Sequence, residues 1–460
     1  MVDPAELLRR GNSSVVAPAG HGKTEVIAKV AALGNRTLVL THTHAGVHAI
    51  RARLKRLGVP TARAAVETVA SWSTRYAYAF PGVAQPPPGD PQSGAEWDQL
   101  YAGSRAALDV AAIRDVVGSS YDRILVDEYQ DCNSLQHELT IALSTIVPTT
   151  VFGDPMQGIF EFAGATLDWD REIFPTFPLF GSLDQPYRWK DKNPDLGAWV
   201  AETRLKLLRG EPIDLMDSRI SYRPSSDAFD MGVLFDGIDA KEGSFAAIHC
   251  NKGLCYKLAS AANGGYQAIE EVAANRLGLF ARAWDAARDV KAKANAIIEL
   301  SRDCFHKRTT AETEAEAAEV LLIREGLNVA YAGMNDGNGA EAAVPFMALL
   351  RKRPLYKLYR GGLWRDCEHA VGELAAGRAE TMVAAAERIK QRAHNTGRKL
   401  PGRTVSTPLL LKGLEFDHVV IPDATHFGRE RQARAKLFYV AISRATRSLT
   451  IGSSSRFLTF

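Results

Sequence analysis

Hydrophobic and polar positions follow two different patterns along the 460 residues of the chain. Four short apolar runs have the length of buried β-strands and end near small or charged residues: 14–17, 123–126, 149–152 and 245–249. From about 252 to 400 the pattern becomes helical and rich in alanine, most clearly at 269–288, 289–300 and 311–324. Strands followed by helical stretches predict an α/β fold, with a mainly helical segment in the second half of the chain.

The loop after the first apolar run has the composition of a phosphate-binding loop, and a helical pattern follows it from 25 to 32. Its residues are Ala17, Pro18, Ala19, Gly20, His21, Gly22, Lys23 and Thr24. Glycines let the backbone approach a polyphosphate closely, and the start of the helix directs free N–H groups at it. We expect Lys23 to reach the β- and γ-phosphates of ATP and Thr24 to hold Mg²⁺.

Two adjacent carboxylates end the second apolar run. Ligands of an α/β sheet lie at the carboxyl ends of its strands, so Asp127 could contact Mg²⁺ and Glu128 could polarise the attacking water. An acidic pair at a strand end is also common without any catalytic role. After the third run, the amide of Gln157 can sense a γ-phosphate without changing charge.

Three later segments complete the set: Gln185-Pro186-Tyr187-Arg188, Lys412-Gly413-Leu414-Glu415-Phe416 and the stretch from Tyr439 to Ala445. Two of them carry an arginine, Arg188 and Arg444, that could stabilise the charge of a phosphoryl-transfer transition state. A single arginine is more often a solvated surface residue, so neither segment is informative alone.

The order and spacing of these segments resemble the UvrD/Rep-like branch of the superfamily 1 DNA helicases. In that branch the phosphate-binding loop is followed by a segment like Thr41-His42-Thr43-His44-Ala45 and then by the acidic, glutamine and arginine segments in this order. The matches cover roughly 12–190 and 404–450. The resemblance implies two RecA-like P-loop NTPase domains with ATP between them. It also implies single-stranded DNA across their top and ATP-driven 3′→5′ movement along it, with single-stranded or partly duplex DNA as the partner.

The resemblance also assigns roles to single residues. The catalytic residues would be Lys23, Glu128, Gln157, Arg188 and Arg444, the two arginines coming from the second RecA-like domain. Mg²⁺ would be held by Thr24 and Asp127, and Glu415 would contact nucleotide or metal across the cleft. The DNA strand would contact Thr41, Thr43 and His44, and its bases would stack on Phe160 and Phe162.

The same resemblance divides the chain into segments. The first RecA-like domain would be 1–70 and 116–183, with a reduced accessory segment at 71–115. The second would be 184–251 and 401–460, interrupted by a helical accessory domain at 252–400. The proline- and glycine-rich residues 80–94 indicate an extended connector without a compact core. Arginines and lysines in the later part of the insertion indicate either phosphate contacts or a solvated helix face.

The chain departs from the family pattern at several positions. No glutamine motif for adenine is visible in residues 1–13, and Phe162-Ala163 stands in place of the usual Trp-Arg pair. Pro186 replaces the usual Asn, and Leu409 replaces a His. These changes leave the ATPase residues intact and reduce the number of family residues that contact DNA.

Composition limits the remaining possibilities. A net charge of +3 is too small for a strongly basic nucleic-acid binder, so any DNA footprint must be a local groove. The five cysteines form no CxxC pair. Cys250, Cys255, Cys304 and His306 could be imagined as metal ligands, but scattered reduced thiols are the favoured interpretation. Without a signal peptide or an apolar run of spanning length, we expect a soluble cytoplasmic protein.

Three function classes stay open at this point. The first is a DNA-stimulated ATPase that translocates and unwinds. The second is a DNA-sensing ATPase with weak unwinding, partnered with a separate nuclease. Such compact relatives resemble the helicase-like subunit of Gabija-type anti-phage systems, which works with an OLD-family nuclease. The third is RNA remodelling, as in the Upf1-like branch, which the forms of the arginine and KGLEF segments disfavour.

Overall fold

The computed structural model describes most of the chain. The described residues are 2–91, 93–159, 167–225, 227–237, 240–263, 265–269, 274–308, 312–337, 339–396, 402–429 and 433–460. They form two compact units, which are described separately. The first unit contains residues 1–213, 430–447 and 459–460, and the second contains 214–429 and 448–458.

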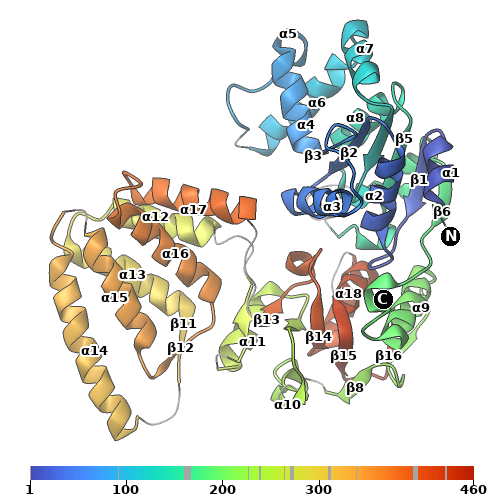
Figure 1. Cartoon of the computed structure of the whole chain (residues 1–460). Helices are drawn as coiled ribbons and strands as arrows, with labels where there is room; N and C mark the ends of the chain where they lie inside the picture. Colours follow the sequence, from blue (N-terminus) through green and yellow to red (C-terminus); the bar gives the residue numbers. More distant parts are fainter. Residues whose placement is uncertain are drawn as a thin grey trace. The chain divides into compact units, whose positions relative to one another are not determined.

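The first unit is built on a six-stranded sheet with the order β3-β2-β4-β5-β1-β6 (Figure 1). Its strands are β1 (Ser13–Val16), β2 (Thr37–Thr41), β3 (Ala64–Thr68), β4 (Arg123–Val126), β5 (Thr149–Gly153) and β6 (Leu179–Ser182). Every neighbouring pair is parallel. The segments that follow the strands therefore start at one edge, the carboxyl edge of the sheet. The predicted strands at 14–17, 123–126 and 149–152 are confirmed.

Alternate residues of the strands pack into two separate cores. Leu38, Leu40 and Val126 belong to one, and Val39 and Leu125 to the other, because successive strand side chains point to opposite faces. The first core is covered by α4 (Val69–Ala79), α6 (Gly94–Ala107), α7 (Ala111–Ser120) and α8 (Ser134–Ser144). The second is covered by α1 (Pro4–Arg9), α2 (Lys23–Leu33) and α3 (His44–Arg56).

The prediction of an extended connector at 80–94 is wrong for the start of that segment. The short helix α5 (Pro81–Ala84) occupies its start, and Ala84 is buried in the same core as Trp72, Leu100 and Tyr101. A Cβ on Gly103 of α6 would lie 2.0 Å from the carbonyl oxygen of Ala84, so α5 and α6 pack backbone to backbone. The proline- and glycine-rich composition predicts no helix in this segment. The aromatic and aliphatic side chains on either side of it form the core in which Ala84 is buried.

The first unit is completed by two helices that come from later parts of the chain. They are α9 (Pro194–Leu208) and α18 (Arg434–Ile442). Short helical turns occupy Tyr129–Asp131 (η1), Pro155–Gln157 (η2), Trp169–Ile173 (η4) and Tyr187–Trp189 (η5). Both α9 and η2 pack against α18. The two compact units thus divide the chain at other residues than the predicted domain boundaries do. Those boundaries stay a prediction.

The second unit contains another six-stranded sheet, with the order β10-β13-β9-β14-β15-β8. Its strands are β8 (Ser221–Pro224), β9 (Phe245–Ile248), β10 (Gln267–Ala268), β13 (Arg403–Ser406), β14 (Phe416–Ile421) and β15 (Ala445–Ser453), of which β15 begins in the first unit. The predicted strand at 245–249 is confirmed as β9, and it pairs in parallel with both β13 and β14. Helices α10 (Met231–Leu234) and α11 (Lys252–Ala261) pack on this sheet.

The predicted helical insertion is confirmed as a bundle with its own core. It consists of α12 (Ala274–Asp285), α13 (Val290–Cys304), α14 (Glu314–Gly333), α15 (Ala340–Lys352), α16 (Gly361–Ala375) and α17 (Met382–Thr396). Trp284, Ile297, Phe346 and Trp364 are buried together in it, and the antiparallel pair β11 (Phe305–Lys307) and β12 (Tyr356–Leu358) closes one side. The remaining short elements are β7 (Ile213–Asp214), η7 (Leu409–Leu411), η8 (Ala424–Arg429) and β16 (Phe457–Leu458). Among the described residues, no helix has the length and apolar character needed to cross a membrane.

Candidate active site

The phosphate-binding loop connects the end of β1 to the first residue of α2, Lys23. Gly20 and Gly22 adopt positive φ angles of 75° and 82°, a backbone region that L side chains disfavour. A Cβ on Gly20 would lie 2.7 Å from the Cβ of Arg188, and one on Gly22 would lie 2.9 Å from the ring of Tyr187. Both positions therefore require glycine for conformation and for space. The loop fits a polyphosphate, because free N–H groups at the start of α2 are available to it.

Lys23 lies against the two carboxylates at the end of β4. Its Nζ is 2.8 Å from Oδ1 of Asp127 and also donates to Oε1 of Glu128. Burial alone would lower the pKa of Lys23, but the two carboxylates raise it above its usual range. The acidic pair already holds one cation, the ammonium, so its oxygen atoms also suit Mg²⁺. Thr24 follows Lys23 as the second residue of α2.

Glu128 has an unusual backbone and a fixed carboxylate. Its φ of 55° places it in the left-handed region, which is disfavoured for a residue with a side chain. Its N–H donates to Oδ1 of Asp127 over 2.9 Å. The side-chain amide of Gln130 donates to Oε2 of Glu128, while its oxygen accepts from the N–H of Asp154 over 3.0 Å. Gln130 therefore connects the candidate base to the segment after β5.

Asp154 anchors that segment through a buried ion pair. Its Oδ1 accepts from Arg204 of α9 over 2.7 Å, and its carboxylate is fully buried. Oδ2 accepts from the amide of Gln157 over 3.1 Å, so the predicted sensor is held by the same carboxylate. The guanidinium of Arg204 lies 5.9 Å from the ring centre of Tyr439. The hydroxyl of Tyr439 accepts from the N–H of Ala19 over 2.9 Å, which joins α18 to the phosphate-binding loop.

No role was predicted for Gln130, Arg204, Tyr187 or Tyr439. All except Arg204 lie in recognised motifs, but none carries a local sign of the groups that it contacts. Burial raises the pKa of Tyr439, so its hydroxyl stays neutral beside the loop. Burial has the opposite effect on a base and lowers the pKa of His21, which favours its neutral form. The Nδ1 atom of His21 lies 2.9 Å from the carbonyl oxygen of Ala19.

Both predicted arginines lie in the first unit, which also contains Lys23. The N–H of Arg188 donates to the carbonyl oxygen of Gly20 over 3.0 Å, and its guanidinium donates to the carbonyl oxygen of Ser443. Arg444 is 1% exposed and donates to the carbonyl oxygen of Val440 over 2.9 Å and to the hydroxyl of Ser443 over 2.7 Å. The structure thus brings Arg188 to the loop, and it directs Arg444 to the end of its own helix. Glu415 belongs to the second unit, where it is exposed just before β14. The roles predicted for these residues stay predictions.

Two sequence families match the chain. The UvrD/REP helicase N-terminal domain matches residues 93–172, which include the acidic pair, and the UvrD-like helicase C-terminal domain matches 405–451, which include Glu415 and Arg444. Over these two segments the chain is similar to the UvrD-like helicases. The two six-stranded sheets are consistent with two RecA-like helicase domains, and the helical bundle interrupts the second sheet between β10 and β13.

Among solved structures, this UvrD-like chain is similar to one titled as a complex of arterivirus nonstructural protein 10 (helicase) with DNA. The two are 14% identical with a TM-score of 0.27, over 52% of this chain and 47% of that one. The UvrD-like chain thus spans about half the length of that helicase, and the superposition is too loose to equate single residues. No curated protein matches the sequence.

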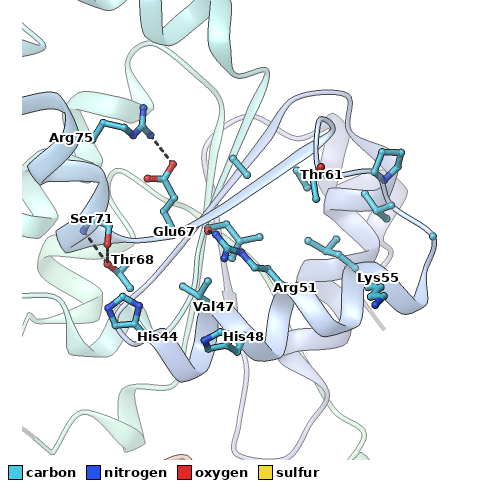
Figure 2. Close-up of a pocket in the computed structure, with 17 residues that line it drawn as sticks. His44, Val47, His48, Arg51, Lys55, Thr61, Glu67, Thr68, Ser71 and Arg75 are labelled. Atoms are coloured by element: carbon cyan, nitrogen blue, oxygen red, sulfur yellow. Dashed lines mark hydrogen bonds and ion pairs between the residues drawn. The ribbon is translucent and has the colours of Figure 1, made fainter. Parts of the chain in front are cut away.

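Three of the predicted DNA-contacting residues lie at the carboxyl edge of the first sheet. Thr41 ends β2 and is buried, Thr43 caps α3 by accepting from the N–H of Gly46 over 3.0 Å, and His44 is the exposed first residue of α3. Phe160 and Phe162 lie outside the described residues. Figure 2 shows that His44 also lines a groove between α3 and β3, beside Thr68, Ser71 and His48.

The carboxyl edge of the second sheet carries a different set of polar groups. His249 follows β9 and its ring centre lies 4.7 Å from that of His426, whose Nε2 is 3.4 Å from Oδ2 of Asp423. Burial, reinforced by His426, lowers the pKa of His249 to about 4. Across the described ranges, no three His, Cys, Asp or Glu side chains are grouped so as to hold a metal ion, and none of the five cysteines forms a disulfide.

Proposed function

We propose that this UvrD-like chain is an ATP-dependent DNA helicase or translocase that hydrolyses ATP and moves 3′→5′ on single-stranded DNA. The observation that supports it most directly is the group formed by Lys23, Asp127 and Glu128 beside a glycine-dependent phosphate loop. This group combines a cation for the polyphosphate, a metal ligand and a general base within contact distance. The soluble cytoplasmic location expected from the sequence belongs to the same proposal.

In this proposal the residues around the loop hold and orient ATP. Lys23 exchanges its two carboxylate partners for the β- and γ-phosphates, whose charge the N–H groups of the loop also meet. Mg²⁺, held by Thr24 and Asp127, supplies charge neutralisation on the phosphates when it is bound. Glu128 accepts the proton of the attacking water, and Gln130 holds its carboxylate in one orientation.

The remaining predicted residues would couple hydrolysis to DNA. Gln157, held by Asp154, would sense the γ-phosphate from the segment that leads to Phe160 and Phe162, on which bases would stack. Arg188 and Arg444 would stabilise the charge that develops on the transferred phosphoryl group. Thr41, Thr43 and His44 would contact the DNA strand.

A second candidate is a DNA-sensing ATPase subunit of an anti-phage defence complex, with weak unwinding and a separate nuclease partner. The sequence favours this second candidate at two positions where a residue usual in the family is replaced. Ala163 replaces the arginine of the usual Trp-Arg pair and removes one cation from the DNA-contacting set, and Pro186 replaces the usual asparagine. Both candidates require the same ATP site, so the DNA response distinguishes them.

An ATPase assay run beside a strand-displacement assay tests the proposal. The substrates are duplexes with a 3′ or a 5′ single-stranded tail, in DNA and in RNA versions. DNA-stimulated turnover with displacement from the 3′-tailed DNA alone is expected. Stimulation by DNA without displacement would favour the sensing subunit, and displacement from the RNA duplexes alone would exclude both candidates.

A further inference from the structure

We propose that the groove between α3 and β3 binds the continuation of the DNA strand that contacts His44, an inference that rests on the proposed DNA-directed function. The groove has a volume of about 1070 Å³ and lies entirely within the first unit. It begins at the carboxyl edge of the sheet, at His44 and Thr68, and follows the full length of β3 to Gly58 and Thr61. It therefore extends the predicted contact segment along the side of the domain.

One wall of the groove is a stripe of nitrogen-bearing side chains on α3. His44, His48, Arg51 and Lys55 are spaced by four, three and four residues, which places them on one face of the helix. All four line the groove (Figure 2). Arg51 and Lys55 are both exposed, so their charges face solvent. A row of cations along a groove is the feature that follows a phosphate backbone.

The other wall is β3, the strand at the end of the sheet order. The carbonyl oxygen of Val66 accepts from the guanidinium of Arg51 over 2.7 Å, so Arg51 reaches across the groove. A guanidinium has five N–H donors, and this bond leaves others for a phosphate. The one carboxylate among the lining residues, Glu67, is paired with Arg75 over 2.6 Å. Three cations therefore face one carboxylate, and the groove has an excess of positive charge.

These contacts favour a nucleic-acid strand over an acidic peptide. A peptide that adds to an open sheet edge needs the backbone groups of that edge, and Arg51 already occupies the carbonyl of Val66. A phosphate backbone needs only the cations. Among the described residues that line the groove, none is a phenylalanine, tyrosine or tryptophan. Bases therefore lack a large stacking platform there, and binding is expected to be independent of base sequence.

The test measures binding of a short and a long oligothymidylate to the full chain over a range of salt concentrations. The variants are Lys55→Gln and the double variant Arg51→Gln/Lys55→Gln. The matched control is Arg56→Gln, which removes an exposed cation from the same helix outside the groove. Each lost phosphate contact should reduce the slope of log K against log salt by about 0.7 and weaken binding roughly fivefold at 0.1 M salt. The loss is expected with the long oligonucleotide, while the short one binds wild type and variants alike.

Arg51→Lys separates charge from structure, because it keeps the cation and loses the fork geometry that bonds Val66. Binding of the long oligonucleotide close to wild type by this variant supports the inference. Equal losses in Arg56→Gln, or losses that do not depend on oligonucleotide length, would overturn it. So would a poly-glutamate peptide whose binding the groove variants abolish while DNA binding stays unchanged. If the wild-type chain binds neither oligonucleotide, the proposed function itself fails. If it binds both and the groove variants match it, only the groove assignment fails.

Discussion

The two sheets share a parallel arrangement and differ in the groups at the carboxyl ends of their strands. In the first, the carboxyl edge carries a glycine loop, a lysine and the carboxylates of Asp127 and Glu128. In the second, the corresponding edge carries His249 and the pair Asp423 and His426, and its described strands are not followed by a loop of this kind. The fold supplies an edge in both cases, but only the first has the backbone freedom and the charge to hold a polyphosphate.

The buried polar groups at the two edges also differ in their hydrogen bonding. In the first, the carboxylate of Asp154 is fully buried and accepts from Arg204, from the amide of Gln157 and from the N–H of Met156. In the second, Nε2 of His249 and Oγ of Ser406 are buried without a hydrogen-bond partner among the described residues. Satisfied networks fix side chains in one position, whereas burial keeps the imidazole of His249 neutral, with only its Nδ1 accepting a hydrogen bond, from the N–H of Asn251 over 2.9 Å. The hydrogen-bonded network described around Asp154 therefore has no counterpart among the described residues at the second edge.

The largest expected effect is the loss of ATP turnover in Lys23→Ala. This substitution removes the counter-charge of the phosphates and leaves Asp127 and Glu128 adjacent without their common partner. Turnover should fall below detection, and nucleotide affinity should fall with it. A steady-state ATPase assay with a nucleotide-binding titration checks this, and His249→Asn at the second edge is the control that should keep turnover.

Glu128→Gln should separate binding from chemistry. The amide preserves the shape of the side chain but cannot accept a proton, so turnover should fall by about 10²–10⁴-fold while nucleotide still binds. Full turnover in this variant would show that another residue activates the water. The same assays, run at saturating ATP, make the measurement.

Arg204→Met should destabilise the first unit by about 3–5 kcal/mol, because it leaves the carboxylate of Asp154 buried without its cation. Adding Asp154→Asn should recover much of that loss, since the amide oxygen can still accept from the N–H of Met156. Denaturant unfolding of the single and double variants measures both effects. If the single variant is as stable as the wild type, the ion pair does not hold this segment in place.

The smallest effect concerns pH and the second edge. The unfolded imidazole has a pKa near 6.5, and burial lowers that of His249 to about 4, so the unfolded chain binds a proton that the folded one does not. The contribution of His249 to the free energy of unfolding is therefore fully present above about pH 6.5. The free energy of unfolding should fall by roughly 3 kcal/mol as the pH approaches 4. Unfolding midpoints across this range should depend less on pH in His249→Asn. An unchanged dependence would assign the acid sensitivity to other groups.

Local patterns were sufficient for three strands of the first sheet, β1, β4 and β5, and for the loops that follow them. The strand that stops just before Asp127 and the strand that ends at Gly153 are visible because each apolar run stops at a polar or small residue. The partners of the network were not visible, because the hydrogen bond between Ala19 and Tyr439 joins residues 420 positions apart. No local signal carries that contact. Similarly, the helices α5 and α6 around residues 80–94 are stabilised by burial against each other and against α4 and α8 rather than by their own composition.

The hydrogen bond between Arg51 and Val66 also affects how the protein behaves when it is concentrated. A strand at the end of a sheet can recruit the strand of another molecule, and such recruitment leads to aggregation. Arg51 occupies one carbonyl on that strand, and its charge, with that of Lys55, repels a second copy. Salt screens this repulsion within about 10 Å at 0.1 M. The same side chains that are proposed to follow DNA would thus keep the free protein monodisperse, most effectively in dilute salt.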